Sequence, residues 1–446
     1  MIEATQLRQA PARPAYVDRL VVLDDDPTGV QTLAGIRVLL AWADPGRIAR
    51  ALADRNSVHL ITNTRALEPD EARRTVAAAA RASLGAVSGA RLVLRGDSTL
   101  RAHLLEEYLG LSDVLGRGRP PLLLVPALPS AGRVTREGVH LIDRGGRTEP
   151  LHQTEYASDG VFAYSTARLL EWAEERSDGL FPASAGRELH LDELRSGGAD
   201  SVAAALVDLS RAGRPAVLAP DAETEEDLAT IATGYAKAMR DGAVAVVRCA
   251  PAFAGILAGT AAPGLTTAPG TTGPLLVVCG SYVPMSTRQL ATLDSAHPGL
   301  LVEVDVEVLV GSGAAAEEER AARAASATIA SAGCAVLTTP RERPEGITLD
   351  AGRLVAEGMA RVAGRIEPTP EVVIAKGGIT SAVTLLVGFQ SSEADVVGPV
   401  LPGVSHWRAA TADGALDYLV VPGNVGDERL LVELVDLVRE RMSSCS

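Results

Sequence analysis

Three consecutive carboxylates, Asp24, Asp25 and Asp26, follow an apolar run in the stretch VVLDDDPTGVQT. The run from Leu20 to Leu23 predicts a buried strand, and Asp26-Pro27 fits a helix N-cap followed by proline at the first helical position. A cap needs one carboxylate, so the others are candidates for orienting a hydroxyl, accepting a proton or holding a metal. In open α/β sheets ligands bind beyond the carboxyl ends of strands, where these side chains are expected. The alternative is capping beside a solvated acidic turn.

Two further strands are followed by polar groups. Strand 58–62 leads to Arg65, which has the alternative role of a salt-bridge partner. Strand 91–94 leads to the turn RGDSTLR, in which guanidinium groups suit a carboxylate or phosphate, and hydroxyl and carboxylate groups suit a polyol. The turn supplies Arg95, Gly96, Asp97, Ser98 and Arg101 as candidate substrate-binding residues. His140 is predicted on a proline-stiffened loop after strand 122–125, as a ligand contact or a structural histidine.

Glycine-containing turns follow three strands of the C-terminal part. Gly280-Ser281 follows strand 275–279, and Gly423-Asn424 follows strand 417–421. The sharpest case is KGGITS after strand 371–375, where two glycines allow close approach and a helix N-terminus favours negative charge. It supplies Lys376, Gly377, Gly378, Ile379, Thr380 and Ser381 as candidate phosphate-binding residues. It is not a Walker A loop, and a plain Gly-Gly turn with a threonine cap is the alternative.

Short aliphatic runs that alternate with longer helical patterns must position these turns, which is typical of α/β layers with mainly parallel sheets. We expect two domains, each with a mainly parallel sheet flanked by helices, and an active site in the interdomain cleft. Further strands are predicted at 37–41, 216–219, 243–248, 299–304 and 334–338. Helices are predicted at 69–84, 167–175, 199–211, 224–240, 286–296, 314–332, 350–366 and 428–442.

The uncharged Gly, Ala, Pro and Thr segment 259–274 predicts a linker. The expected order is a flexible arm (1–18), an N-terminal domain (19–258), this linker, and a C-terminal domain (275–446). GSGAAA at 311–316 is interpreted as a loop, so a dinucleotide fingerprint is not supported.

The chain has 446 residues, 47% of them hydrophobic, and a formal charge of −14, which argues against nucleic acid as the main partner. We see no apolar stretch long enough to span a membrane and no signal peptide, and expect a cytoplasmic protein. Four cysteines, without metal-ligand spacing, are expected to be reduced and mostly buried. A homodimer is one option for the oligomeric state, which the sequence does not decide.

These motifs, in this order, resemble the four-carbon acid sugar kinases, which include D-threonate, D-erythronate and 3-oxotetronate kinases. The matching stretches are DDDPTG, NTR, RGDSTLR, PALPSAGRVTREGVH, CGS, KGGITS and PGNVGDE, and the resemblance extends from Val21 to Leu437. It implies that the N-terminal domain binds a sugar acid and the C-terminal domain binds ATP. Pro27, Val30 and Ala102 depart from the usual family pattern, which bears on the particular substrate.

The resulting hypothesis is phosphorylation of a hydroxyl on a small hydroxy-acid by ATP. Arg65, with Arg95 or Arg101, would hold the substrate carboxylate, and Asp25 or Asp26 would orient the hydroxyl and accept its proton. Mg²⁺ would bridge the ATP phosphates with few protein ligands. The alternatives are a non-catalytic sugar-acid and nucleotide-binding protein, a kinase of another hydroxy-acid, and a nicotinamide-dependent oxidoreductase. The last is disfavoured because no GxGxxG motif is present.

Overall fold

The computed structural model describes residues 16–30, 33–260, 264–341 and 349–440. The chain forms two compact units. The first unit contains residues up to Asp25, Pro45–Val58 and 68–263; the second contains Asp26–Asp44, His59–Leu67 and residues from 264 onward. Two short N-terminal segments therefore pack with the C-terminal part, which a single cut at 259–274 does not describe.

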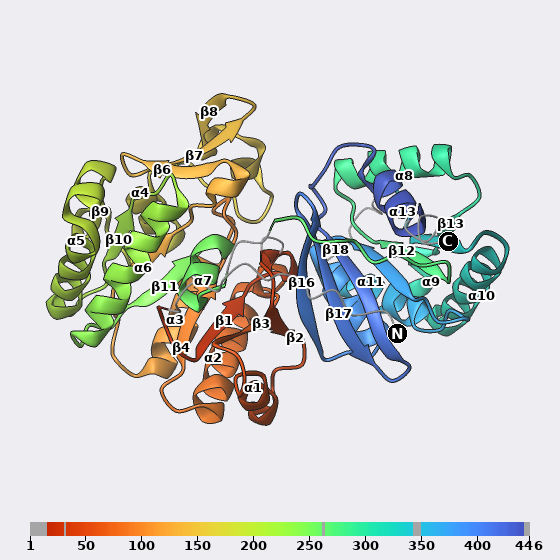
Figure 1. Cartoon of the computed structure of the whole chain (residues 1–446), viewed down its shortest axis with the longest axis horizontal. Helices are drawn as coiled ribbons and strands as arrows, with labels where there is room; N and C mark the ends of the chain where they lie inside the picture. The colour runs from red at the N-terminus through yellow and green to blue at the C-terminus, as the bar shows by residue number, and fades with distance from the viewer. Residues whose placement is uncertain (1–15, 31–32, 261–263, 342–348, 441–446) are drawn as a thin grey trace, which may run out of the picture. The chain divides into compact units, whose positions relative to one another are not determined.

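The first unit contains strands in the order β3-β1-β4-β11-β5-β10-β9, and those from β1 to β9 in this order pair in parallel (Figure 1). The register places Asp24 opposite Arg95, and Arg95 opposite Cys249, so the ends of three strands coincide. The strands are β1 (Leu20–Asp24), β3 (Ser57–Ile61, whose first two residues belong to this unit), β4 (Arg91–Arg95), β5 (Leu122–Val125), β9 (Arg187–Leu189), β10 (Val217–Pro220) and β11 (Val246–Cys249).

Helices of the first unit bury their apolar sides against this sheet. Leu206 of α5, Ile231 of α6 and Phe253 of α7 join one core with inward residues of the strands such as Val22 and Leu123. Thr224 caps α6 in a capping box with Asp227, which explains why that helix begins where the sequence predicts. The helices are α1 (Pro45–Ala51), α2 (Pro69–Ala86), α3 (Leu104–Leu115), α4 (Leu169–Arg176), α5 (Leu191–Ala212), α6 (Glu225–Arg240) and α7 (Pro251–Ala258).

A separate antiparallel sheet follows β5 in the chain. Its strands are β6 (Arg133–Arg136), β7 (Val139–Arg144) and β8 (Arg147–Pro150). The predicted proline-stiffened loop is therefore wrong beyond its first turn, the 3-10 helix Pro129–Ala131. Glu137-Gly138 makes a tight connection, with both residues at positive φ, so the chain turns back and the two strands pair.

The second unit contains strands in the order β13-β14-β12-β15-β18-β17-β16-β2 (Figure 1). The first five pair in parallel, and β17, β16 and β2 extend them in antiparallel fashion. The strands are β2 (Ile36–Leu39), β12 (Leu275–Cys279), β13 (Leu301–Glu303), β14 (Cys334–Thr338), β15 (Val372–Lys376), β16 (Glu393–Leu401), β17 (Val404–Thr411) and β18 (Gly414–Val421).

Alternate residues of these buried strands supply two cores, as expected where helices cover both faces. Val277 and Ile374 pack with α8 and α13, whereas Leu276 and Val373 pack with α10 and α11. The helices are α8 (Pro284–Ala296), α9 (Val306–Leu309), α10 (Ala314–Ala332), α11 (Leu349–Ala363), α12 (Gly378–Val383, continued by a π-helical turn Thr384–Gly388) and α13 (Leu430–Glu440).

The two-domain α/β fold is confirmed, and all twelve predicted strands overlap observed ones. Strands β16 and β17 and helices α1, α3 and α7 were not predicted. Of the predicted arm, residues 16–18 are described, and Val17 packs into the first core; the rest of the arm, and residues 441–442 of the last predicted helix, lie outside the described residues. Cys249, Cys279 and Cys334 are buried free thiols, as predicted.

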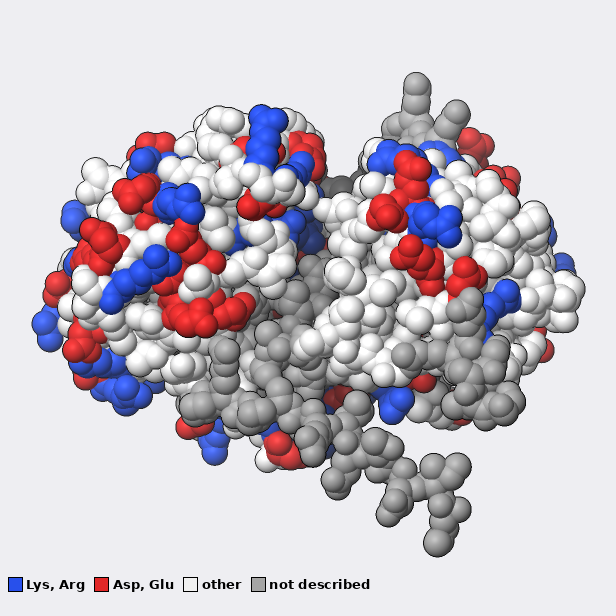
Figure 2. Space-filling view, turned by 45° about the horizontal axis from the view of Figure 1, so that its top comes forward, with Lys and Arg blue, Asp and Glu red and all other residues white. Residues whose placement is uncertain are grey.

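Acidic and basic side chains are mixed over the face shown in Figure 2, without a continuous basic surface there. Among the described residues, no helix is long and apolar enough to cross a membrane.

Candidate functional site

The three consecutive aspartates each have an arginine partner. Asp24 is ion-paired with Arg95, whose Nη1 also lies 3.2 Å from Oδ1 of Asp25. Asp26 is ion-paired with Arg65. The predicted proximity of Arg65 to the aspartates is confirmed for Asp26. These pairs explain how like charges tolerate neighbouring positions in the chain.

A buried chain of alternating charges continues from Asp25 into the first unit. Nη2 of Arg248 on β11 lies 3.8 Å from Oδ2 of Asp25, and Nη1 of Arg248 is paired with Glu107 of α3. The order is Asp24, Arg95, Asp25, Arg248 and Glu107, and no side chain in it is more than 4% exposed. Such charges are retained in an interior only when each is paired.

Burial acts differently on the two guanidinium groups. It lowers the pKa of Arg95 to about 9, although Asp97 acts in the opposite direction. Burial also acts to lower the pKa of Arg248, but the charges of Glu107 and Asp25 outweigh it, so the pKa of Arg248 is raised. The sequence predicted the strand that contains Arg248 but no role for its side chain. The signal that could have indicated one is a charged residue in the otherwise apolar run AVAVVRC.

The turn after β4 is fixed by its own side chains. Asp97 accepts hydrogen bonds from the backbone N–H of Thr99 (3.1 Å) and from Nε of Arg101 (2.7 Å). Arg101 also lies 3.6 Å from Asp159 and keeps 25% exposure, whereas the Arg95 side chain is 3% exposed. Of these two arginines, therefore, Arg101 is the one accessible to a ligand.

His140 lies on β7, buried against the same turn. Its Nε2 is 2.9 Å from the carbonyl oxygen of Ser98, and its Nδ1 is 3.1 Å from the hydroxyl of Thr135. Burial lowers the pKa of His140 to about 4, so the ring is neutral near pH 7. Because a carbonyl only accepts, we assign the proton to Nε2. These contacts favour a structural role for His140 over a contact with a ligand.

Asp26 lies against the glycine turn of the second unit. Its Oδ1 accepts a hydrogen bond of 2.7 Å from the backbone N–H of Thr28, in the 3-10 turn Pro27–Val30. A Cβ atom added to Gly378 would lie 2.6 Å from Oδ2 and 2.8 Å from Oδ1 of Asp26. The predicted cap is thus a short 3-10 turn, and the carboxylate that makes it also contacts the start of α12.

Glycines allow three strand-end turns of the second unit to converge. A Cβ atom added to Gly280 would lie 2.9 Å from Oγ1 of Thr380, and one added to Gly423 would lie 2.9 Å from Oγ of Ser281. Gly377 has φ 110°, and a Cβ atom added to it would lie 3.2 Å from Cβ of Ser281 and 3.3 Å from Oγ1 of Thr380. The turns after β12, β15 and β18 therefore form one compact cradle, here called the glycine cradle.

Lys376 is buried and contacts the backbone of the glycine cradle, so its side chain does not lie on the cradle surface. Its fully buried Nζ donates to the carbonyl oxygens of Pro422 (2.7 Å) and Val425 (3.2 Å). Burial lowers the pKa of Lys376 to about 8. These contacts tie the turn after β18 to the end of β15, so they favour a positioning role over the predicted direct contact with a nucleotide.

The other predicted residues of this region differ in accessibility. The Ser381 hydroxyl is buried and donates to the carbonyls of Gly377 (2.7 Å) and Ala375 (3.1 Å), whereas Ile379 and Asn424 are exposed.

Arg341, after β14, was not predicted. Its Nη1 donates to the carbonyl of Ser281 (3.0 Å), and its guanidinium lies 5.6 Å from the centre of the Tyr282 ring. It is a cation beside the cradle.

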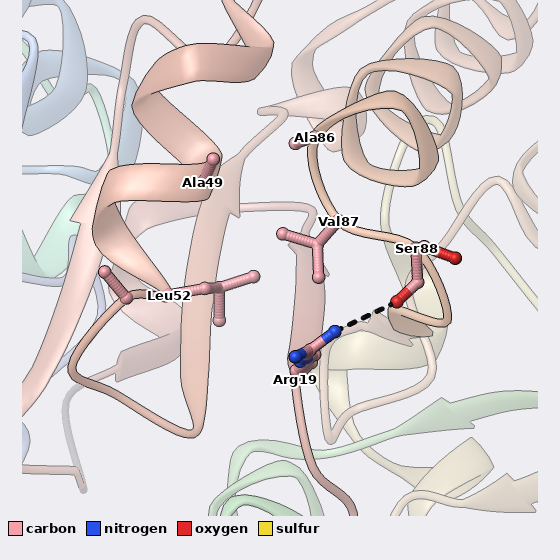
Figure 3. Close-up of a pocket in the computed structure, with 7 residues that line it drawn as sticks. Arg19, Ala49, Leu52, Ala86, Val87 and Ser88 are labelled. Atoms are coloured by element: carbon pink, nitrogen blue, oxygen red, sulfur yellow. Dashed lines mark hydrogen bonds between the residues drawn. The ribbon is translucent and has the colours of Figure 1, made fainter.

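A surface pocket of about 340 Å³ lies elsewhere, at the opposite end of β1 (Figure 3). Nη1 of Arg19 donates to the carbonyl of Ser88 there (3.3 Å). The pocket is lined by Arg19, Ala49, Leu52, Ala53, Ala86, Val87 and Ser88. It shares no residue with the turns described above, so we assign it no part in the site.

One further cluster has groups that metals use. Ligand atoms of Glu137, His190 and Asp221 lie within 4.8 Å of one another. Asp221 is already occupied as an acceptor, from the backbone N–H groups of Glu137 (2.8 Å) and Gly138 (3.0 Å). These bonds hold the turn between β6 and β7 on the end of β10, which is a sufficient structural role.

Comparisons with known proteins match the N-terminal and C-terminal parts of the chain separately. A family described as "Sugar-binding N-terminal domain" matches residues 20–257, and one described as "Nucleotide-binding C-terminal domain" matches residues 276–431. A D-erythronate kinase from Heliobacterium modesticaldum is 32% identical over 261 residues, which are 58% of this chain and 55% of that protein. The match therefore spans about half the length of that relative.

Solved structures share the fold. A protein from Salmonella typhimurium LT2 has a TM-score of 0.67 at 20% identity, with 93% of this chain and 98% of that chain covered. A protein from Haemophilus influenzae has a TM-score of 0.61 at 17% identity, with 93% and 99% covered. At these identities the likeness concerns the architecture alone.

Proposed function

This chain belongs to the four-carbon acid sugar kinase family, with its sugar-binding N-terminal and nucleotide-binding C-terminal domains, and on that premise we propose that it is an ATP-dependent kinase. Its acceptor would be a hydroxyl of a four-carbon sugar acid of the threonate, erythronate or oxotetronate type. The D-erythronate kinase from Heliobacterium modesticaldum supports this substrate class. The observation that carries the proposal is the pairing, in one chain, of a polar strand-end turn with a glycine cradle.

The glycine cradle is the proposed site of the ATP phosphates. Gly377, Gly378 and Gly423 carry no Cβ atom, so phosphate oxygens would approach the backbone of these turns closely, in space that added Cβ atoms would fill. The backbone N–H of Gly377 itself donates to the carbonyl oxygen of Val421 (2.8 Å). Ser281 and Thr380 offer hydroxyls, and Ile379 and Asn424 are candidates for contacts with the rest of the nucleotide. Lys376 would act by holding the cradle in shape. Mg²⁺ bound with the phosphates would neutralise their charge, and Asp26 is the carboxylate beside the cradle.

The turn after β4 is the proposed site of the sugar acid. Arg101 would bind the substrate carboxylate, and Asp97 and Ser98 would hold hydroxyls. Arg95 and His140 would keep this turn in place, since both are buried in contacts of their own. Arg65 remains a candidate for a substrate contact, while Asp25 and Asp26 are the candidate catalytic carboxylates.

The chemistry requires alignment of the acceptor hydroxyl with the terminal phosphate, and a group to take the hydroxyl proton. Little covalent chemistry is left to the protein in such reactions, so orientation and charge placement supply most of the rate enhancement. The two substrates must meet in the catalytic state for direct transfer to occur.

An ADP-release assay with Mg-ATP tests this function against D- and L-threonate, D- and L-erythronate and 3-oxotetronates. We expect acid-dependent ADP release with at least one of them. Gly377→Ala, strained at positive φ and crowded by Ser281, should raise the KM for ATP at least tenfold. Gly352→Ala is the matched control, because Gly352 is exposed on α11 and an added Cβ atom would meet no other atom within 4 Å. It should leave the KM for ATP unchanged.

Silence across the panel with ATP binding intact would refute the substrate class. The chain would then be a kinase of another hydroxy-acid or a non-catalytic binding protein. An unchanged KM for ATP in Gly377→Ala would refute the proposed position of the phosphates.

A further inference from the structure

Asp25 and Asp26 are neighbours in the chain but lie in different surroundings. The Asp25 side chain is 2% exposed and lies between two buried guanidinium groups, those of Arg95 and Arg248. The Asp26 side chain is 13% exposed and belongs to the second unit. The two carboxylates are therefore not interchangeable candidates for one role.

Asp26 is positioned against the glycine cradle with little freedom. Oδ1 is fixed by the backbone N–H of Thr28 at 2.7 Å and by the Thr28 hydroxyl, and Oδ2 is paired with Arg65. Both oxygens lie within 2.8 Å of where a Cβ atom of Gly378 would be. A glycine at 378 is thus required by the carboxylate, because a methyl group would displace it.

Resting on the proposed function, we propose that Asp26 is the catalytic base and that Asp25 is a positioning residue. The acceptor hydroxyl oxygen attacks the terminal phosphorus of ATP, and the bond from that phosphorus to its bridging oxygen breaks. ADP leaves with the bonding electron pair, and the hydroxyl proton passes to the Asp26 carboxylate. A base must lie close to the phosphate that the acceptor attacks, and the Asp26 carboxylate contacts Gly378, in the turn proposed to bind the phosphates.

Arg65 has a defined part in this arrangement. A carboxylate beside the phosphates of ATP repels them, and the guanidinium paired with Oδ2 offsets that repulsion. Asp25, in contrast, is buried between Arg95, at the end of β4, and Arg248, on β11, and links the two side chains by its charge. Its removal should loosen the turn that follows β4 rather than abolish the proton transfer.

The test compares Asp26→Asn with Asp25→Asn in the full chain, a matched pair of isosteric substitutions at adjacent positions. For Asp26→Asn we expect kcat to fall about 10³-fold, within the range for loss of a general base. Its KM for the sugar acid should stay within threefold, and its thermal midpoint within 3 °C of the unsubstituted protein, each a rough expectation. For Asp25→Asn we expect a thermal midpoint at least about 5 °C lower and a kcat within about tenfold of the unsubstituted protein.

The pH profile separates a base from a metal ligand. If Asp26 accepts the proton, the residual kcat of Asp26→Asn should rise with pH, because the hydroxyl must lose its proton without help. Raising the Mg²⁺ concentration should not restore kcat.

Three outcomes would overturn the inference: an Asp26→Asn kcat within tenfold of the unsubstituted protein, rescue of that variant by Mg²⁺, or loss of kcat without loss of stability in Asp25→Asn. An unsubstituted protein that is silent toward every acid refutes the proposed function itself, and the inference falls with it. Activity in the unsubstituted protein with an unaffected Asp26→Asn refutes the inference alone.

Discussion

Replacement of Arg248 by methionine should destabilise the first unit strongly. The substitution keeps an apolar stem of similar length but removes the charged contacts that Arg248 makes with Glu107 and with Asp25. Arg248 is 4% exposed and Glu107 is 3% exposed, so water does not replace the lost contact. Breaking a buried pair in this way costs about 3–5 kcal/mol.

The thermal midpoint gives the magnitude a direct readout. In a domain of this size 1 kcal/mol shifts the midpoint by about 2–4 °C, so Arg248→Met should lower it by about 6–20 °C. Arg323→Met is the matched control, since Arg323 is paired with Glu319 on the surface of α10, where the two side chains are 69% and 63% exposed. We expect a change of no more than about 0.5 kcal/mol there.

A double substitution tests the cause. Arg248→Met with Glu107→Met removes both charges, and it should be more stable than Arg248→Met alone, with an interaction free energy of about 1–3 kcal/mol. Differential scanning calorimetry of the four proteins of this cycle would supply the values. An Arg248→Met midpoint within 2 °C of that of Arg323→Met would refute the reasoning that the alternating charges are a buried network.

Two further predictions concern buried titratable groups. Burial lowers the pKa of Lys376 from 10.5 to about 8, so between these pH values the unfolded chain binds a proton that the folded chain does not. The free energy of unfolding should therefore increase with pH across that window. Lys376→Met should remove this pH dependence, which urea midpoints would measure. Lys376→Met should also raise the KM for ATP about tenfold, since the tie to Pro422 is lost. Because burial lowers the pKa of His140 from 6.5 to about 4, its contribution to stability should be lost as pH falls through that range, by up to about 3 kcal/mol. His140→Gln should reduce this loss of stability at acidic pH, and a variant with the same loss would contradict a buried, neutral imidazole.

The elements that the sequence predicted best are those whose burial is uniform. Runs such as Leu275–Cys279 and Cys334–Thr338 are buried at every position, so their composition alone indicates a central parallel strand. Strand β16 alternates partly buried and buried positions in its first half and contains Gly398 and Pro399, and β17 ends in a partly exposed stretch, so neither strand is a uniformly buried run. The pairing of β16 with β2, which comes more than 350 residues earlier, is a tertiary property; Arg37 and Asp395 show it with a hydrogen bond of 3.0 Å.

The sequence predicted which strand-end turns lie close together, and it was less informative about which of their side chains are accessible. The strand-end rule brought Arg65 to the aspartates and gathered Ser281, Gly377 and Gly423 in one cradle. It could not separate Arg95 from Arg101, because burial depends on partners such as Arg248 and Glu107 that approach from other strands and helices. For the same reason Lys376 looked like a phosphate ligand, although its ammonium is used by backbone carbonyls.

The most direct test of the central claim is ³¹P NMR of a reaction that contains the protein, Mg-ATP and the most active acid of the panel. The account predicts a phosphate monoester that grows in step with ADP, one ester for each ATP consumed, while inorganic phosphate stays near the background. ADP that appears with inorganic phosphate and no ester would contradict the account, because the terminal phosphate would then be transferred to water rather than to a sugar acid.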